Sequence, residues 1–180
     1  MAHKLIHTAI IGISSLAAFA SCADTPTAAG KADVGAKAEL KATSGNGVSG
    51  TLTLTQQAGG VHITGTIAGL APNSTHGFHV HEKGDCSAPD ATSAGGHFNP
   101  GHHEHGNPAS EQRHAGDMPN VVSDARGTAK VDIVATGVTL RSGEANDIVG
   151  KAIIVHQQAD DYKSQPSGNA GSRIACGIIK

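Results

Sequence analysis

Apolar and polar residues alternate with a period of two along much of the chain between residues 34 and 179. The clearest examples are VSGTLTLTQ at 48–56 and VHITGTIAG at 61–69. Such alternation is typical of half-buried antiparallel strands. Adjacent glycines in the connection Gln57–Gly60 permit the positive φ that a hairpin turn needs. These two runs therefore predict a β-hairpin.

Similar runs occupy most of the remaining chain. A second turn is expected at Asp124–Gly127, and further strands are predicted at 35–42, 76–82, 117–123, 127–135, 150–156 and 173–179. Eight strands without a convincing helix favour an all-β sandwich or barrel. Two segments, 83–116 and 157–172, fit no strand and are rich in Gly, Pro, Asp, Asn and Ser. Long loops in a compact domain are usually functional, so we expect the chemistry of the protein there.

The composition supports one domain with an aliphatic core. The chain has 180 residues, no Trp, one Tyr, three Phe and 24 Gly, so Val, Ile, Leu and Ala must form most of the core and many tight turns must join the strands. The formal charge is -2, and Lys and Arg are scattered along the chain. Because nucleic-acid binding needs a basic stripe, we expect no nucleic-acid partner.

The N-terminus predicts export. Residues 5–20 form an apolar run behind Lys4 and are followed by small residues, which is the pattern of a signal peptide. The run falls short of the ~20 apolar residues of a transmembrane helix. We therefore divide the chain into a signal peptide at 1–21, a small and polar tether at 22–33 and a folded domain at 34–180.

Cleavage of the leader could follow Ala20 or precede Cys22. The second possibility resembles the processing site of a bacterial lipoprotein. The alternative is that Cys22 is simply lost with the leader. A secreted protein tends to pair its cysteines, and pairing Cys86 with Cys176 would leave Cys22 single. A single cysteine beside a leader is what a lipid anchor requires. We predict a periplasmic or cell-envelope protein attached to the membrane through a lipidated Cys22.

Histidines and one aspartate form the candidate chemistry. In HVH at 79–81, His79 and His81 are two residues apart on a predicted strand, so both imidazoles lie on one face. His156 ends another strand and could bind the same metal. The loop carries His97, His105, His114 and Asp117, and three imidazoles with one carboxylate complete a tetrahedral shell suited to zinc.

The first three histidines need a fourth nitrogen. His97 could supply it by bridging two metals through its two ring nitrogens. An all-nitrogen, open-sided site suits copper, which cycles between two oxidation states.

These motifs resemble the bacterial copper, zinc superoxide dismutases. GFHVHEKGDC (77–86) and SAGGHFNP (93–100) resemble the segments with the first copper ligands and the bridging histidine. HGNP (105–108) and RHAGDMPN (113–120) resemble the zinc loop, and IIVHQQADD (153–161) and GNAGSRIACG (168–177) the last copper ligand and the closing segment. The resemblance implies an eight-stranded antiparallel Greek-key barrel or sandwich with two long functional loops. It also implies an enzyme that dismutates superoxide with one copper and one zinc ion per chain.

The resemblance also assigns roles by position. It gives His79, His81 and His156 to copper, His97 to both metals, and His105, His114 and Asp117 to zinc. It implies that Asp160 accepts hydrogen bonds from His79 and His105, that Arg173 holds the substrate anion beside copper, and that Cys86 pairs with Cys176. From the residues alone, Asp160 would be a solvated acid and Arg173 a surface arginine.

Some positions stay open. Relatives often carry a lysine just before the GNAGSR segment, where this chain reads KSQPSGN, so Lys163 or Lys83 could steer the substrate instead. His102 and His103 are either solvated or a weak surface metal site, and we expect no metal role for His62 and His76.

The main alternative to a superoxide dismutase is a copper-delivery or other metal-binding protein on the same fold. An adhesive β-domain would explain only the strands. The protein could be a monomer or a homodimer.

Overall fold

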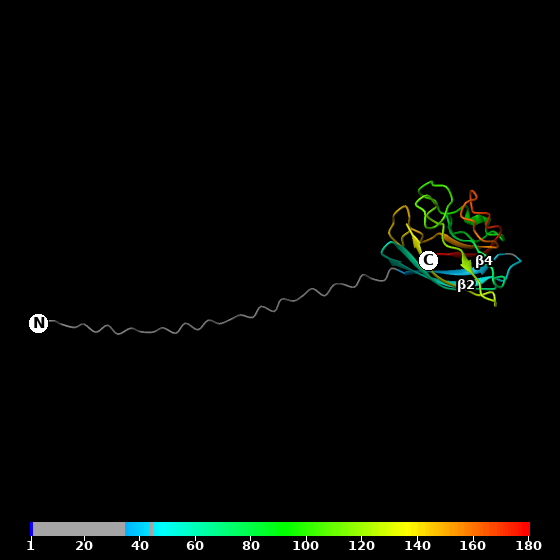
Figure 1. Cartoon of the computed structure of the whole chain (residues 1–180), viewed down its shortest axis with the longest axis horizontal. Helices are drawn as coiled ribbons and strands as arrows, with labels where there is room; N and C mark the ends of the chain where they lie inside the picture. The colour runs from blue at the N-terminus through cyan, green and yellow to red at the C-terminus, as the bar shows by residue number, and fades with distance from the viewer. Residues whose placement is uncertain (2–34, 44) are drawn as a thin grey trace. The chain divides into compact units, whose positions relative to one another are not determined.

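The computed structural model describes residue 1 and residues 35–43 and 45–180 of the chain (Figure 1). Beyond Met1, the predicted signal peptide, the tether with Cys22 and the domain start at Val34 lie outside the described residues and stay predictions. No helix in the described part of the chain is long and apolar enough to span a bilayer.

Seven strands form one antiparallel sheet in the order β5-β8-β9-β1-β2-β3-β7. A second, two-stranded sheet pairs β4 with β6. The strands are β1 (Gly35–Ala42), β2 (Ser49–Gln57), β3 (Gly60–Ala68), β4 (Thr75–His76), β5 (Phe78–His81), β6 (Val121–Val122), β7 (Ala129–Thr136), β8 (Ala152–His156) and β9 (Arg173–Ile178). Within the described residues the only helix is the short 3₁₀ turn η1 (Thr92–Ala94). The prediction of an all-β fold is confirmed.

The predicted alternation is realised in the first three strands. In β1, residues 36, 38 and 40 are buried while the residues between them are exposed. Leu52 and Leu54 of β2 and Ile63 and Ile67 of β3 are fully buried in the same core. One face of this part of the sheet therefore covers the core, and the other carries the polar residues.

Strand β8 is buried on both faces. Ile153 and Val155 point into the main core, whereas Ala152 and Ile154 join a smaller cluster with Ala91 and Ala94 of the loop that follows β5. This second cluster packs the 83–96 loop against β8 and β9. It places that loop, and the residues that follow it, beside His156 at the end of β8.

Two predicted strands are shorter than expected. The run 76–82 divides into β4 and β5 because Gly77 bonds to the 156–158 segment, with its N–H on the Gln158 carbonyl (2.7 Å) and its carbonyl on the His156 N–H (2.8 Å). Of the run 117–123 only Val121 and Val122 form a strand. Pro119 has no N–H for a ladder, and the Asp117 side chain is engaged in the site described below. The predicted eight strands thus become nine elements.

The loops follow the prediction with one addition. The segment 83–116 contains only η1, and 157–172 contains no strand; the two loops are drawn green and orange in Figure 1. A third long connection, 137–151, is present in addition to the two loops predicted from the sequence. Its shape depends on the Asp147 carboxylate, which accepts hydrogen bonds from the backbone N–H groups of Arg141, Gly143 and Val149 (2.9–3.1 Å). Such local bonds to a turn aspartate leave little signal in apolar periodicity.

A disulfide joins Cys86 to Cys176, with their Cα atoms 5.8 Å apart. The pairing implied by the resemblance is confirmed. The bridge ties the 83–96 loop to the middle of β9 across a sequence separation of 90 residues. On the chain-entropy account, closing a loop of that length stabilises the folded state by about 4.6 kcal/mol.

Candidate metal centre

Four buried residues, three from the 83–116 loop and one directly after it, lie close together. The ligand atoms of this group all lie within 4.8 Å of one another, and its members, which we call the three-histidine–aspartate group, are His97, His105, His114 and Asp117. Asp117 Oδ1 lies 2.8 Å from His97 Nδ1, 3.0 Å from His105 Nδ1 and 3.5 Å from His114 Nδ1. One carboxylate oxygen therefore faces three imidazole nitrogens of the same type.

The backbone fixes the Asp117 carboxylate. Its second oxygen, Oδ2, accepts hydrogen bonds from the N–H groups of Gly106 (3.1 Å) and His114 (2.9 Å). Oδ1 is thereby left for the imidazoles. Three nitrogens and one carboxylate oxygen in a buried cluster are the donor set of a closed, four-coordinate zinc site.

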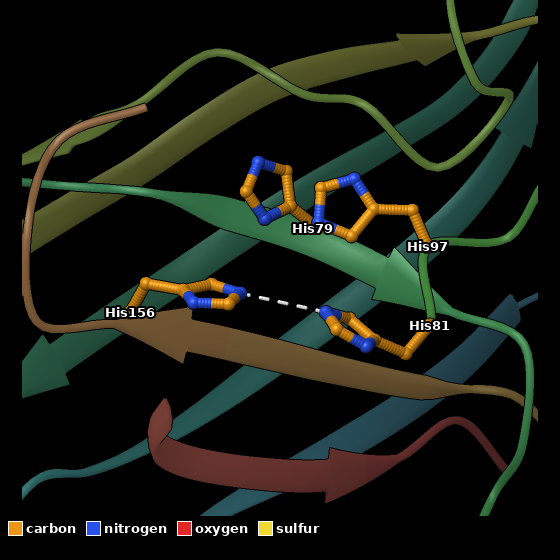
Figure 2. Close-up of side chains that lie close together, drawn as sticks. All are labelled: His79, His81, His97 and His156. Atoms are coloured by element: carbon orange, nitrogen blue, oxygen red, sulfur yellow. Dashed lines mark hydrogen bonds between the residues drawn. The ribbon is translucent and has the colours of Figure 1, made fainter. Parts of the chain in front are cut away.

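A second buried group consists of histidines alone. We call His79, His81, His97 and His156 the four-histidine group, and their ligand atoms also lie within 4.8 Å of one another. Figure 2 shows their rings around a common space, with His79 and His81 on one strand, His156 on the next and His97 on a loop. His81 Nε2 and His156 Nε2 approach to 3.4 Å. The predicted convergence of the HVH strand pair with His156 is observed.

The outer nitrogen of each imidazole in this group has a carbonyl or carboxylate acceptor. His81 Nδ1 donates to the Gly95 carbonyl (2.9 Å) and His156 Nδ1 to the Gly171 carbonyl (3.1 Å). His79 Nε2 donates to Asp160 Oδ2 (2.8 Å). A neutral imidazole that donates through one nitrogen presents a lone pair at the other. The nitrogens that face one another are thus the ones free to bind a cation.

Among the residues that the structure describes, three buried ring nitrogens have no hydrogen-bond partner: His79 Nδ1, His97 Nε2 and His114 Nδ1. Buried polar atoms are nearly always paired, and each of these atoms faces the centre of one of the two groups. Metal ions at the two centres would satisfy all three. The residues present therefore fit two metal ions.

His97 is the member common to both groups. Its Nδ1 lies 2.8 Å from Asp117 Oδ1, while its Nε2 is the unpartnered atom on the four-histidine side. The two nitrogens of one ring thus point to different centres, as the bridging prediction requires.

The electrostatics suit cations. Burial, and then the neighbouring His79, lower the pKa of His156 to about 3, and burial lowers the pKa of His97 to about 4. Both imidazoles are therefore neutral at neutral pH, which is the form that binds a metal. Burial alone would lower the pKa of His105, but hydrogen bonds to Asp117 and Asp160 raise it to about 9. The two carboxylates thus favour positive charge at this end of the site.

Asp160 links the two groups. Its carboxylate is fully buried, and Oδ2 accepts from His79 Nε2 (2.8 Å) while Oδ1 accepts from His105 Nε2 (3.0 Å). Hydrogen bonds from His105 and His79 hold the pKa of Asp160 below its usual range, although burial opposes this. The contacts that the resemblance implied for Asp160 are present.

Arg173 lies opposite His156 in the β8–β9 pairing. Its guanidinium donates to the carbonyls of Ala91 (2.7 Å) and Gly95 (2.6 Å). The Gly95 carbonyl also accepts from His81. The Gly95 carbonyl therefore fixes the position of the Arg173 guanidinium relative to His81. The half-buried guanidinium has further N–H groups that can donate to a small anion.

The other histidines in the described part of the chain belong to neither group. His62 is on the sheet surface and bonds to Asp132 (2.8 Å). His103 bonds to Gln112 (3.1 Å), and His102 is exposed. His76 is buried and its Nδ1 lies 2.8 Å from the His156 carbonyl, a contact that could not be expected from the sequence pattern. Lys83 and Lys163 are exposed.

Comparison with known proteins gives one consistent result. The profile of the family described as copper/zinc superoxide dismutase (SODC) matches residues 48–179. Cu-Zn superoxide dismutase 2 of Aquifex aeolicus (strain VF5) is 46% identical over 151 residues, which is 82% of this chain and 88% of the relative. An extracellular Cu-Zn superoxide dismutase of Brugia pahangi is 42% identical over 151 residues, 79% of this chain and 73% of the relative.

Two solved structures are similar to this chain in both fold and sequence. A SOD-like protein from Bacillus subtilis has a TM-score of 0.72 at 40% identity and covers 78% of this chain and 95% of its own. The clock protein EA4 has a TM-score of 0.73 at 42% identity, covering 83% and 95%.

Proposed function

The chain belongs to the copper/zinc superoxide dismutase family, and we propose that it dismutates superoxide outside the cytoplasm with copper in the four-histidine group and zinc in the three-histidine–aspartate group. His97, which belongs to both groups, would be a ligand of each ion. The observation that carries this assignment is the pair of buried clusters sharing one imidazole, whose unpartnered nitrogens face the two centres.

The two centres differ in what they can do. The zinc group would supply four protein ligand atoms and leave no open position, so its role would be to hold the His97 ring and the loop in place. The copper group has nitrogens only, and copper supplies there a one-electron cycle between two oxidation states. Arg173 binds the superoxide anion beside this group through its permanently charged guanidinium.

Protons are handled by His97. With both ions bound, its ring would hold no N–H proton, because both nitrogens would be ligands. Nε2 could then take up one proton in the first half of the cycle and return it in the second, while Nδ1 would remain on the zinc side. In balance, one superoxide loses an electron and leaves as dioxygen. The second gains that electron and two protons and leaves as hydrogen peroxide. The chain's contribution is to orient the rings and to hold the anion in place.

The proposal is tested by loading the purified chain with both metals. Elemental analysis should give one copper and one zinc per chain, and the loaded protein should remove superoxide in a stopped-flow assay. A protein that binds both ions without turnover would instead be a metal carrier on this fold, and the proposed activity would be wrong.

Replacing Arg173 with Ala should lower kcat/KM about 10- to 100-fold, since a hydrogen-bonded contact to a charged group contributes roughly 1.5–3 kcal/mol. Metal content should not change, because Arg173 belongs to neither group. Arg126→Ala is the matched control, since that side chain is 88% exposed and pairs only with Asp124. An unchanged kcat/KM in Arg173→Ala, measured under conditions where Arg126→Ala equals wild type, would refute the anion-binding role.

We also propose export and a lipid anchor. The apolar leader at 5–20 with Cys22 behind it supports both, and one relative carries the name of an extracellular enzyme. Mass spectrometry of the mature protein should find residue 22 at the N-terminus with a diacylglyceryl group. A mature chain that begins at Ser21, or that carries an unmodified Cys22, would rule out the anchor.

A further inference from the structure

We propose that Tyr162, the one tyrosine of the chain, is a positioning residue for the Asp160 carboxylate and, through it, for His79 and His105. This inference rests on the proposed function, because it concerns metal ligands. It assigns a role to a side chain that belongs to neither ligand group.

Tyr162 contacts the carboxylate directly. Its backbone N–H donates to Asp160 Oδ1 at 2.6 Å. The same oxygen accepts from His105 Nε2 at 3.0 Å, while Oδ2 accepts from His79 Nε2 at 2.8 Å. The tyrosine amide thus restricts the orientation of the carboxylate that contacts both metal groups.

The phenol acts through Asn120. Its oxygen accepts the Asn120 backbone N–H at 2.8 Å. The Asn120 side chain in turn brackets the backbone of Asp160, since its Nδ2 donates to the Asp160 carbonyl and its Oδ1 accepts from the Asp160 N–H, both at 2.9 Å. Tyr162 and Asn120 therefore hold Asp160 at its amide, its carbonyl and its carboxylate.

This arrangement connects two segments that are far apart in sequence. Asn120 lies three residues after the ligand Asp117, and Tyr162 lies two residues after Asp160. The phenol thereby fixes the spacing between the zinc loop and the loop that carries the bridging carboxylate. If the hydroxyl is removed, the half-buried Asn120 amide loses its partner and the spacing is less constrained.

The backbone of Tyr162 is unfavourable for a bulky residue. Its φ is +60°, in the left-handed region that Gly, Asn or Asp adopt at lower cost. Strained backbone of this kind persists where the surroundings hold it, often at functional sites. The phenol bond to Asn120 and the amide bond to Asp160 are the contacts that hold it here.

The carboxylate has little room to move. Gly168 lies on its other side, where a β-carbon would overlap Asp160 Oδ1 and come within 2.8 Å of His105 Nε2. Asp160 is thus confined between Gly168 and the Tyr162 amide. A shift of the 160–162 segment would weaken the bond to His79, the bond to His105, or both.

The test is Tyr162→Phe, which keeps the ring and removes the hydroxyl. Zinc affinity, measured on the metal-free protein by competition with a chromophoric chelator, should fall about 10-fold, the lower end of the usual effect for partners of metal-binding histidines. The EPR spectrum of bound Cu(II) should also change, because His79 is no longer held in one orientation. Ser142→Ala is the control: it removes a hydroxyl that accepts the Glu144 backbone N–H (3.1 Å) in the 137–151 loop, and it should change neither quantity.

A double-mutant cycle decides the route of the effect. If Tyr162 acts through Asp160, adding Tyr162→Phe to Asp160→Asn should cause no further loss of zinc affinity. Equal losses in both backgrounds would overturn the inference. So would a Tyr162→Phe protein that is less stable in urea but keeps the wild-type zinc affinity and EPR spectrum, which is the result of a merely structural role. Wild-type protein that binds neither ion would overturn the proposed function, and this inference with it.

Discussion

Replacing His156 with Ala is expected to abolish dismutation while leaving the zinc site filled. The change removes one of four nitrogens from the proposed copper group and leaves a gap beside His81 Nε2, which lies 3.4 Å from His156 Nε2 (Figure 2). Loss of a partner that only orients a ligand already costs about 10- to 100-fold. Loss of the ligand itself should therefore lower kcat/KM by more than about 100-fold.

The substitution removes none of the proposed zinc ligands. His156 belongs only to the four-histidine group, and the Asp117 carboxylate takes its bonds from His97, His105, Gly106 and His114. Elemental analysis of the variant should thus show zinc near one per chain and copper strongly reduced. His102→Ala, a histidine outside both groups, serves as the control. Activity that survives His156→Ala would show that copper is bound elsewhere.

The ligands could be predicted because their geometry is largely local. Strand periodicity alone places His79 and His81 on one face. The 83–116 loop and the aspartate directly after it bring three further histidine ligands and Asp117 into a short stretch of sequence. Asp160 and Arg173 carry no such signal. Their contacts depend on pairing between β5, β8 and β9, so from the sequence they could be identified only through the resemblance to a family.

The residues that support the ligands could not be predicted at all. Gln165 holds the His105 backbone from 60 residues away, with its oxygen on the N–H and its amide group on the carbonyl, both at 2.9 Å. His76 reaches the His156 carbonyl across 80 residues. Such contacts follow from the path of the loops, which is set by single backbone conformations such as the left-handed Tyr162. Apolar periodicity contains no information on them.

The sheet and the two loops therefore contribute different residues to the two metal groups. The sheet supplies His79, His81, His156 and Arg173 on rigid strands. The 83–116 loop supplies His97, His105 and His114, and it is fixed at its start by the disulfide and near its end by Arg113, whose guanidinium donates to the Thr136 carbonyl of β7 (2.9 Å). The 157–172 loop contributes Asp160, which connects both centres. A change at His97 or at Asp160 should therefore alter both metal sites, whereas a change at His156 should alter the copper group alone.

Removing both metals is expected to lower the melting temperature by roughly 15–30 °C. An ion that binds only the folded state at about 1,000 times its Kd stabilises the protein by about 4 kcal/mol, and two ions contribute about twice that. For a domain of this size each kcal/mol corresponds to roughly 2–4 °C or somewhat more.

The structural reason is that the metal-free site leaves buried His79 Nδ1, His97 Nε2 and His114 Nδ1 without partners, a state that is costly in the folded protein. Differential scanning calorimetry of chelator-treated protein, with and without added metals, measures the effect. Zinc alone should recover about half of the difference, since it satisfies the group around Asp117 and orders the bridging ring. Magnesium, which prefers oxygen ligands, should recover none. A metal-free protein that melts within 3 °C or so of the loaded one, well below the shift expected for even one ion, would mean that the two clusters do not bind their ions tightly, and the proposed assignment of both sites would be wrong.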